Sequence, residues 1–531
     1  MQTHPFKSRA TQTRSWVIAI AAPLLVMTIM IFGCSVGPKF VKPEVSINPQ
    51  WSVSDSSLLV TKTMPDSAWW TIFKDSILNR FVGLAYLQNL PLQIAGLRIM
   101  EARAQKAIAV GRQFPQTQAA LANVTAIGVS ENIADAIGID RNFWNFQVGF
   151  DVSWEADFWG KFRQDVKAQT ASLDATVADY DNALVSLTAE VAHTYTMIRT
   201  FEVLIKLANR NAQLQEEGLR IAESRFRTGV TSELDVAQAT TLLESTRASI
   251  PQLEISLIQS QNALCTLLGQ PTGTVQALLQ DSQYIPATSQ KISMVVPAEL
   301  LRRRPDIRNA ERMAAAQNSR IGIAKSELYP QIKLLGTIST QSSSGTGVPT
   351  SDLFGSGSLL YSIGPQLIWP ILNYGQISNS VRVQDARFEQ LLVNYQNTVL
   401  RAAQEVEDGL NGYLKSQETA VFEQKATKGA QRSVDLAFIQ YREGSADYQR
   451  VLEAQRSLLQ AENALAQAHS AIATNLISLY KALGGGWELR NGQPVVSDST
   501  RNEMQHRTNW GNLFSTPVAP VNSNVSTPKD R

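Results

Sequence analysis

Cys34 is the residue whose position most clearly suggests a chemical modification. An apolar run over residues 16–32 follows two arginines, and Gly33 directly precedes the cysteine. Basic residues, an apolar stretch and a small residue before a cleavage point are typical of a secretory signal, here residues 1–33. The pattern resembles a lipoprotein signal, in which the cysteine is acylated after cleavage, and Ser35 favours an outer membrane over an inner one. The alternative is an uncleaved anchor helix with an incidental cysteine.

The other reactive side chains form no recognisable catalytic or metal site. Cys265 and the four histidines have no zinc-ligand spacing, and the carboxylates form no acid/base constellation. Charged residues make up 18% of the chain, below the average of about 25% for soluble proteins. The net charge is +2, so nothing suggests a nucleic-acid partner. We therefore expect neither an enzyme nor a cofactor.

An internal duplication organises most of the chain. Residues 89–269 recur at 304–484 with a constant offset of 215. Trp154 maps to Trp369 and Gly229 to Gly444 under this offset. A repeat of this length predicts two copies of one structural unit.

Each copy contains stretches with the two-residue period of a β-strand. Residues 142–156 carry six apolar residues that alternate with polar ones, and residues 359–371 keep the same register. Their expected partner strands, at 116–130 and 331–343, alternate less cleanly. Alternating apolar and polar residues with aromatics at both ends are what a lipid-facing barrel strand requires. A one-sided soluble sheet is the alternative.

Long helical hairpins follow each strand pair. Apolar residues recur every seven positions from Val177 to Phe226, and the corresponding slots from Leu392 to Tyr441 do the same, with Thr427 as the exception. Such a seam predicts a coiled-coil-like helix of roughly 100 Å at about 1.5 Å per residue. A turn and a return helix complete hairpins over residues 160–268 and 375–483.

The number of strands bears on assembly. No apolar run after residue 34 reaches the roughly 20 residues of a spanning helix, so a membrane crossing would have to use strands. Four strands per chain cannot close a barrel, and about eight is the smallest usual number. At least two chains must therefore combine, and this arithmetic allows both 8 and 12 strands. A barrel that continues into a helical tube is suited to conducting solutes.

Several motifs occur in the order of a known family: Cys34–Phe40, Trp69–Trp70, Trp154–Gly160, Arg302–Arg308, Trp369–Gly375 and Leu483–Trp487. This set resembles the TolC-like outer-membrane efflux proteins, specifically the lipid-anchored channels of tripartite pumps. The resemblance covers residues 34–487. Within one motif, the arginines 302–304 beside Pro305 and Asp306 also predict charge pairing at a helix start.

The resemblance implies a mixed α/β membrane protein: a homotrimer with a 12-stranded outer-membrane β-barrel, a long α-helical barrel and an equatorial domain. Residues 34–88 and 270–303 would belong to the equatorial region. It further implies outer-membrane lipid, a periplasmic adaptor and an inner-membrane pump of the resistance–nodulation–division type as partners. We expect the polar stretch 485–531 to be a disordered tail.

The resemblance also implies a gate at the hairpin tips, the far periplasmic end. The matching positions are Tyr441, Arg450 and Glu453, and Asp447 could replace the acidic group that the family often has at Arg450. Asp235 is equivalent to Arg450 by repeat, so an Asp235–Arg450 tether between neighbouring hairpins is a hypothesis. The alternative is that these charges only solvate the tips.

Three functions follow from this reading. The first is an exit duct for drugs or other small amphiphilic solutes. The second is a duct for secreted proteins with the same architecture, which the lipoprotein signal disfavours. The third, of a different class, is a lipid-anchored coiled-coil scaffold without a pore, which the alternating strands disfavour.

Overall fold

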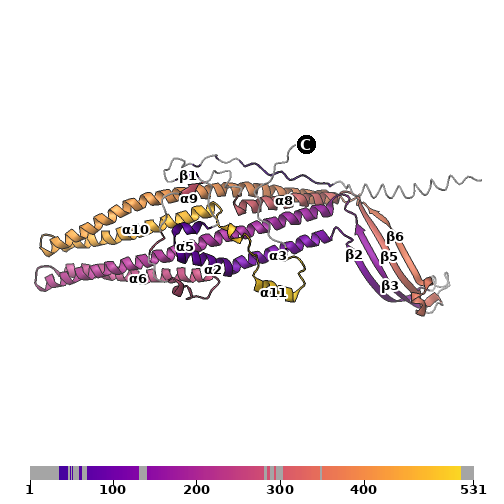
Figure 1. Cartoon of the computed structure of the whole chain (residues 1–531), viewed down its shortest axis with the longest axis horizontal. Helices are drawn as coiled ribbons and strands as arrows, with labels where there is room; N and C mark the ends of the chain where they lie inside the picture. Colours follow the sequence, from indigo (N-terminus) through magenta and orange to yellow (C-terminus); the bar gives the residue numbers. More distant parts are fainter. Residues whose placement is uncertain are drawn as a thin grey trace, which may run out of the picture. The chain divides into compact units, whose positions relative to one another are not determined.

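A computed structural model describes residues 35–45, 48, 51, 59–61, 68–130, 140–279, 284–286, 292–294, 303–346 and 350–515 (Figure 1). Cys34 and the expected signal at 1–33 lie outside the described residues. The chain divides into two compact units, each assembled from separate stretches of sequence. The first combines residues 1–43, 101–174 and 311–393, and the second combines 44–100, 175–310 and 394–531.

The first unit contains an antiparallel sheet in the order β2-β3-β5-β6. Its strands are β2 (Thr117–Gly128), β3 (Asn142–Glu155), β5 (Gln331–Ser343) and β6 (Leu359–Ile368), which lie side by side in Figure 1. Each copy of the repeat contributes one hairpin, and β3 pairs with β5 to join the copies. Short 3-10 turns η3 (Ser344–Thr346), η4 (Thr350–Phe354) and η5 (Ser356–Ser358) follow β5.

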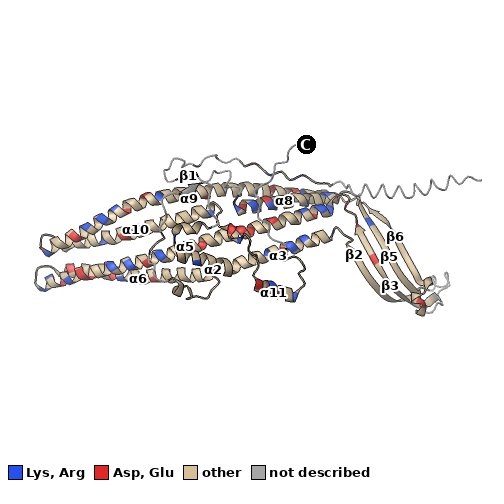
Figure 2. Cartoon of the chain, viewed as in Figure 1, with Lys and Arg blue, Asp and Glu red and all other residues tan. Residues whose placement is uncertain are grey.

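The two faces of this sheet differ in polarity. Phe150, Ile338 and Tyr361 occupy paired positions on neighbouring strands and are 42%, 54% and 73% exposed. Directly paired residues point to the same face, so this face is apolar and uncovered in the single chain. The other face carries amides and hydroxyls: the Gln147 amide donates to the Ser339 hydroxyl (3.3 Å), and the Gln341 amide donates to Asn145 (3.0 Å). Figure 2 shows few charges on the strands.

Two helical hairpins carry most of the remaining chain. Helices α5 (Lys161–Arg227) and α6 (Glu233–Leu267) form the first, and α9 (Gln376–Arg442) and α10 (Tyr448–Ala482) form the second. α5 and α9 each have 67 residues, which is about 100 Å of helix. The turns contain Gly229 and Gly444, whose φ values of 72° and 75° are left-handed and favour glycine.

Shorter elements surround the hairpins. They are η1 (Trp69–Phe73), α2 (Ser76–Gln88), α3 (Leu90–Gly111), η2 (Val275–Leu278), α8 (Pro305–Ser326) and a parallel pair of β1 (Leu59–Thr61) and β4 (Ile292–Met294). The Asp75 carboxylate caps α2 by accepting from the backbone N–H groups of Ile77 and Leu78 (2.9 and 3.1 Å). No helix among the described residues is both long and apolar enough to cross a membrane.

Residues 485–515 are folded, in contrast to the disorder expected for 485–531; residues 516–531 lie outside the described part of the chain. Residues 485–515 contain η6 (Trp487–Arg490) and α11 (Asp498–Arg507), which begins after a capping Ser497. Arg490 is only 3% exposed because it pairs with a buried carboxylate of α5. The backbone of Val495 lies against Gly96, where a Cβ atom would stand 2.1 Å from the Val495 carbonyl oxygen. The polar composition of this segment predicted disorder. The contacts that anchor it are few and long-range, so they leave no periodic pattern in the sequence.

Candidate functional site

The tips of the two hairpins form one packed cluster within the second unit. We call it the tip cluster; its buried members are Ala222, Ala239, Leu242, Val434, Ala437, Phe438, Tyr441, Tyr448, Val451, Leu452 and Leu458. Both hairpins contribute to it. The seven-residue spacing accounts for these contacts, because residues of one helical face recur at that interval.

Two tyrosines lie at its end. Tyr441 is the penultimate residue of α9 and Tyr448 is the first residue of α10, so the turn brings them together with ring centroids 5.2 Å apart in an edge-to-face arrangement. They are 2% and 1% exposed. The Tyr448 hydroxyl has no hydrogen-bond partner among the described residues. Burial, with smaller contributions from Tyr441 and Asp235, raises the pKa of Tyr448 well above its usual value.

Arg225 joins the first hairpin to this pair. Its guanidinium donates a hydrogen bond to the Tyr441 carbonyl oxygen and lies 4.6 Å from the centroid of the Tyr441 ring. This combines a charged hydrogen bond with a cation–π contact. A second, more exposed bridge joins Arg442 to Glu217 (3.4 Å). Both interactions cross from the first hairpin to the second.

Asp235 lies close enough to the tyrosine pair for its charge to act on both phenols. The Thr231 hydroxyl donates to its carboxylate, which is part-buried. The charge of Asp235 ranks after burial among the causes that raise the pKa of Tyr441. A carboxylate near a phenol opposes its ionisation, so Asp235 adds to the effect of burial on the pKa of Tyr441.

The other predicted gate residues lie on the solvent side of α10. Asp447 precedes the helix at its N-cap without a side-chain hydrogen bond, and Arg450 and Glu453 are exposed. Within the described part of a single chain, Arg450 forms no ion pair with Asp235 or with any other residue. The structure thus brings Asp235 and Tyr441 together and leaves the other three apart from them.

Sequence reasoning missed Arg225 and Tyr448. Tyr448 lies three positions before Val451, the first apolar residue of the expected return seam, so the helical period could have indicated its burial. Arg225 had no such signal. Its repeat counterpart is Gln440, so the only mark of this position in the sequence is that the two copies carry different residue types.

A second buried cluster in the same unit is ionic. We call it the Asp181 cluster: the Asp181 carboxylate, 0% exposed, accepts from Arg308 (2.9 Å) and from Arg490. The Arg308 guanidinium also lies 4.8 Å from the Trp487 ring. Burial lowers the pKa of Arg308, and Asp181 partly offsets this effect.

The pairing expected at the start of α8 is confirmed for Arg304. Its guanidinium contacts Asp306 (2.8 Å) and Glu405 (2.7 Å). Burial alone would lower the pKa of Arg304, but the two carboxylates together raise it. The arginine motif therefore has a structural role that ties α8 to α9.

The residue that follows Cys34 is held in the first unit. The Gln164 amide donates to the Ser35 hydroxyl (2.9 Å), and the Val36 N–H donates to the Trp159 carbonyl (3.0 Å). The Asn318 amide donates to the Pro38 carbonyl (2.9 Å). The chain is thus anchored immediately after the proposed acylation position.

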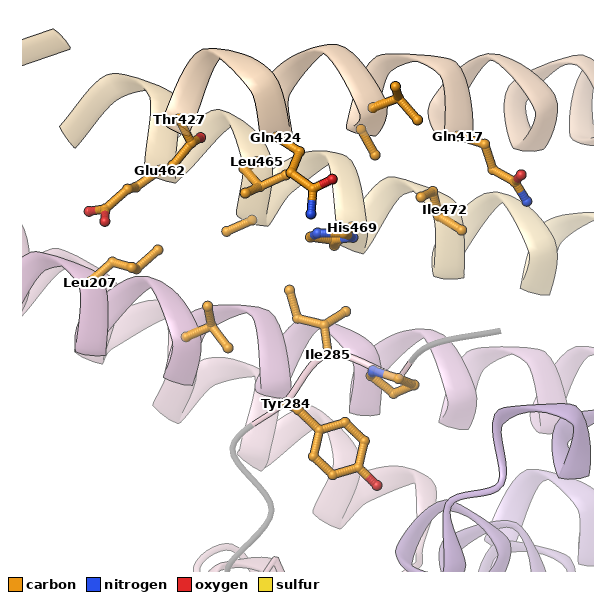
Figure 3. Close-up of a pocket in the computed structure, with 15 residues that line it drawn as sticks. Leu207, Tyr284, Ile285, Gln417, Gln424, Thr427, Glu462, Leu465, His469 and Ile472 are labelled. Atoms are coloured by element: carbon orange, nitrogen blue, oxygen red, sulfur yellow. The ribbon is translucent and has the colours of Figure 1, made fainter. Parts of the chain in front are cut away.

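The second unit also contains a cavity. A cavity of about 690 Å³ lies between α5, α9, α10 and the segment 284–286 (Figure 3). The part of the chain that the structure describes contains no group of three or more His, Cys, Asp or Glu residues arranged to hold a metal.

Comparison with known proteins identifies the family. The family model described as outer membrane efflux protein matches residues 82–270 and 296–485. Nodulation protein T of Rhizobium leguminosarum bv. viciae is 30% identical over 462 residues, which cover 87% of this chain and 92% of that protein. The probable outer membrane lipoprotein SilC of Salmonella typhimurium is 28% identical over 472 residues, covering 87% and 98%.

Solved structures agree with the sequence comparisons. The outer-membrane channel OprN superposes with a TM-score of 0.80 at 30% identity, covering 86% of this chain and all of that chain. The family matches fall on both copies of the internal repeat, and the aligned relatives are matched over nearly their full length. The chain therefore belongs to the outer membrane efflux protein family, and its place is the outer membrane.

Proposed function

We propose that this protein is the exit duct of a tripartite efflux system, conducting small amphiphilic solutes passively from an inner-membrane pump to the exterior. The main support is the four-stranded sheet with its exposed apolar face. Its outer strands β2 and β6 each pair on one side only. In lipid, unpaired strand edges cost several kcal/mol for each unsatisfied group, so the sheet requires partner strands.

Three copies would supply 12 strands and close a barrel. The same threefold symmetry would collect six helical hairpins into a tube that extends into the periplasm. Family membership supports the trimer over the eight-stranded dimer. The periplasmic adaptor and a resistance–nodulation–division pump would then meet the tube at the hairpin tips.

The gate belongs to this proposal. Tyr441 and Asp235, together with Asp447, Arg450 and Glu453, would control the narrow end of the tube. The Asp235–Arg450 tether would form between neighbouring chains, since neither residue pairs with the other within one chain. Each exposed pair of this kind contributes about 0–1 kcal/mol, so three would make a weak, releasable latch.

Acylation of Cys34 supplies the membrane anchor in this proposal. The lipoprotein relative supports it. Several acyl chains anchor a protein stably, whereas one chain alone binds only marginally. Metabolic labelling with a palmitate analogue should mark the wild-type protein and leave Cys34→Ser unmarked; labelling of both would contradict the anchor.

The central test is conductance of the detergent-purified protein in a planar bilayer, together with its mass in solution. We expect a trimer that conducts ions. A trimer that never conducts would favour the scaffold, and a stable monomer would contradict the closure argument. Accumulation of an organic dye in cells that lack the protein, without loss of secreted proteins, would separate efflux from protein secretion.

A further inference from the structure

The cavity shown in Figure 3 is open on one side and is lined by helices of both hairpins. Its volume of about 690 Å³ falls within the roughly 300–1,000 Å³ that is usual for sites that bind small molecules. α5 forms one wall, and α9 with α10 forms the opposite one. The segment 284–286 lies beside α5 and contributes Ile285, which points toward the gap, while Tyr284 points away from it (Figure 3).

Most of the lining is apolar. Leu207 of α5, Leu465 and Ile472 of α10 and Ile285 face the space, and the small side chains of Ala420 and Ala466 leave room. Such a surface would bind the apolar body of an organic molecule by removing both surfaces from water. Gln424 and His469 project toward the middle of the gap and add hydrogen-bonding groups (Figure 3).

One charged residue lies at an end of the cavity. Among the fifteen lining residues, Glu462 is the only Asp, Glu, Lys or Arg. It is 6% exposed, and the Asn211 amide donates to one of its oxygens (2.6 Å). Its other oxygen is 3.5 Å from Arg210, whose side chain is 64% exposed. Arg210 can therefore turn into solvent when another cation approaches, while Asn211 keeps the carboxylate in place.

We propose that this cavity binds an amphiphilic organic cation, with its apolar body between α5 and α10 and its positive charge beside Glu462. An apolar chamber with a single buried carboxylate favours a cation over an anion of the same shape, because the low local dielectric strengthens the charge interaction. The site lies in one chain and does not require a conducting pore. Its failure would leave the proposed duct untouched.

Tetraphenylphosphonium and tetraphenylborate test the proposal, because they match in shape and differ in the sign of charge. Binding to the purified full-length protein would be measured by equilibrium dialysis in a non-ionic detergent. We expect saturable binding of one phosphonium per chain and at least tenfold weaker binding of the borate.

Three variants locate the site. Glu462→Gln keeps a hydrogen-bond partner for Asn211 and should weaken phosphonium binding about tenfold, equivalent to about 1.4 kcal/mol, without weakening borate binding. Ala466→Phe should fill the cavity and weaken binding of both ions. Glu418→Gln is the matched control, because this exposed carboxylate of α9 pairs with Lys415 outside the cavity. The Glu418→Gln variant should bind phosphonium with the affinity of the wild type.

Equal binding of the two ions, unchanged phosphonium binding by Glu462→Gln, or an equal loss in Glu418→Gln would each overturn the proposal. Thermal unfolding of each variant verifies its fold. If Glu462→Gln fails to fold, Ala466→Phe decides: wild-type affinity in that variant places the ligand elsewhere and refutes the site.

Discussion

The Asp181 cluster and the tip cluster are both buried in the second unit, but different interactions hold them together. In the first, a fully buried carboxylate joins arginines from two other elements, and both arginines lie against the ring of Trp487. In the second, apolar side chains and two tyrosines pack beside the bridging Arg225, and the Tyr448 hydroxyl has no hydrogen-bond partner among the described residues.

This difference bears on which cluster can open. Separating the elements around Asp181 would leave buried charges without partners, which costs several kcal/mol. Separating the tips would expose apolar side chains and would hydrate groups that have no hydrogen-bond partner among the described residues, including the amide of Gln215. Segments that move for function come from the low-stability end of a structure. If the tips open as the proposed gate requires, the Asp181 cluster would hold the hairpins in place.

Replacing Asp181 should give the largest effect. Asp181→Ala leaves Arg308 and Arg490 buried without their shared counter-charge, and we expect a loss of about 3–5 kcal/mol in the free energy of unfolding. Denaturant unfolding followed by circular dichroism measures it. Asp179→Asn is the matched control on an exposed position of α5 and should change stability by less than about 0.5 kcal/mol. Equal losses of stability at both positions would contradict the stabilising role of the Asp181 cluster.

Replacing Arg225 should act on the tips alone. Arg225→Ala removes a charged hydrogen bond and a cation–π contact, which together should stabilise the packing of the two hairpin tips by about 1.5–3 kcal/mol. Single-channel recordings should show longer openings or higher conductance, and the free energy of global unfolding should fall by no more than this amount. Arg220→Ala, at an exposed position of the same helix, serves as the control. A fall in global stability well beyond this amount would show that Arg225 supports more than the tips.

Alkaline pH should weaken the region around Trp69, which stacks on Tyr480 at 5.4 Å. Burial, with Tyr413 as a second cause, raises the pKa of Tyr480 from 10.0 to about 12. The pKa of Tyr480 is higher in the folded chain than in the unfolded chain. Its contribution to folding stability is therefore complete below pH 10 and is lost as pH rises from 10 to 12. The free energy of unfolding should therefore fall by about 1 kcal/mol less in Tyr480→Phe than in wild type between about pH 9 and pH 11.

Thermal unfolding at each pH measures this difference. Tyr374→Phe is the control, since Tyr374 is 97% exposed. Identical pH profiles for wild type and Tyr480→Phe would assign the alkaline loss to other tyrosines.

Arg450 should give the smallest effect. Arg450→Ala removes an exposed charge that has no ion-pair partner among the described residues of the chain. We expect the free energy of closing the tips to change by about 0–1 kcal/mol, which would be seen only as a slight rise in conductance at low salt. Asp235→Ala should have a larger effect because Asp235 also faces the tyrosine pair. Conductance equal to wild type in Arg450→Ala rejects the tether between chains.

Much of the fold could be predicted from the sequence alone. Apolar spacing of seven and of two sufficed to suggest long helices and membrane-type strands, because burial along an element follows its geometric period. The repeat made each inference testable on a second copy. Motifs such as Trp154–Gly160 placed the chain in its family. Charge alone also indicated the contact of Arg304 with Asp306, because the two lie two residues apart.

What the sequence could not supply was the choice of partner over long separations. Charge and repeat symmetry suggested Arg450 for Asp235, whereas folding places Asp235 beside Tyr441 and leaves Arg450 exposed. Likewise Arg490, in a stretch that composition marked as disordered, reaches Asp181 across 309 positions. A local period records which side of an element is buried. Only the packing of whole helices decides which side chains meet there, since that depends on the rotation and stagger of elements far apart in the chain.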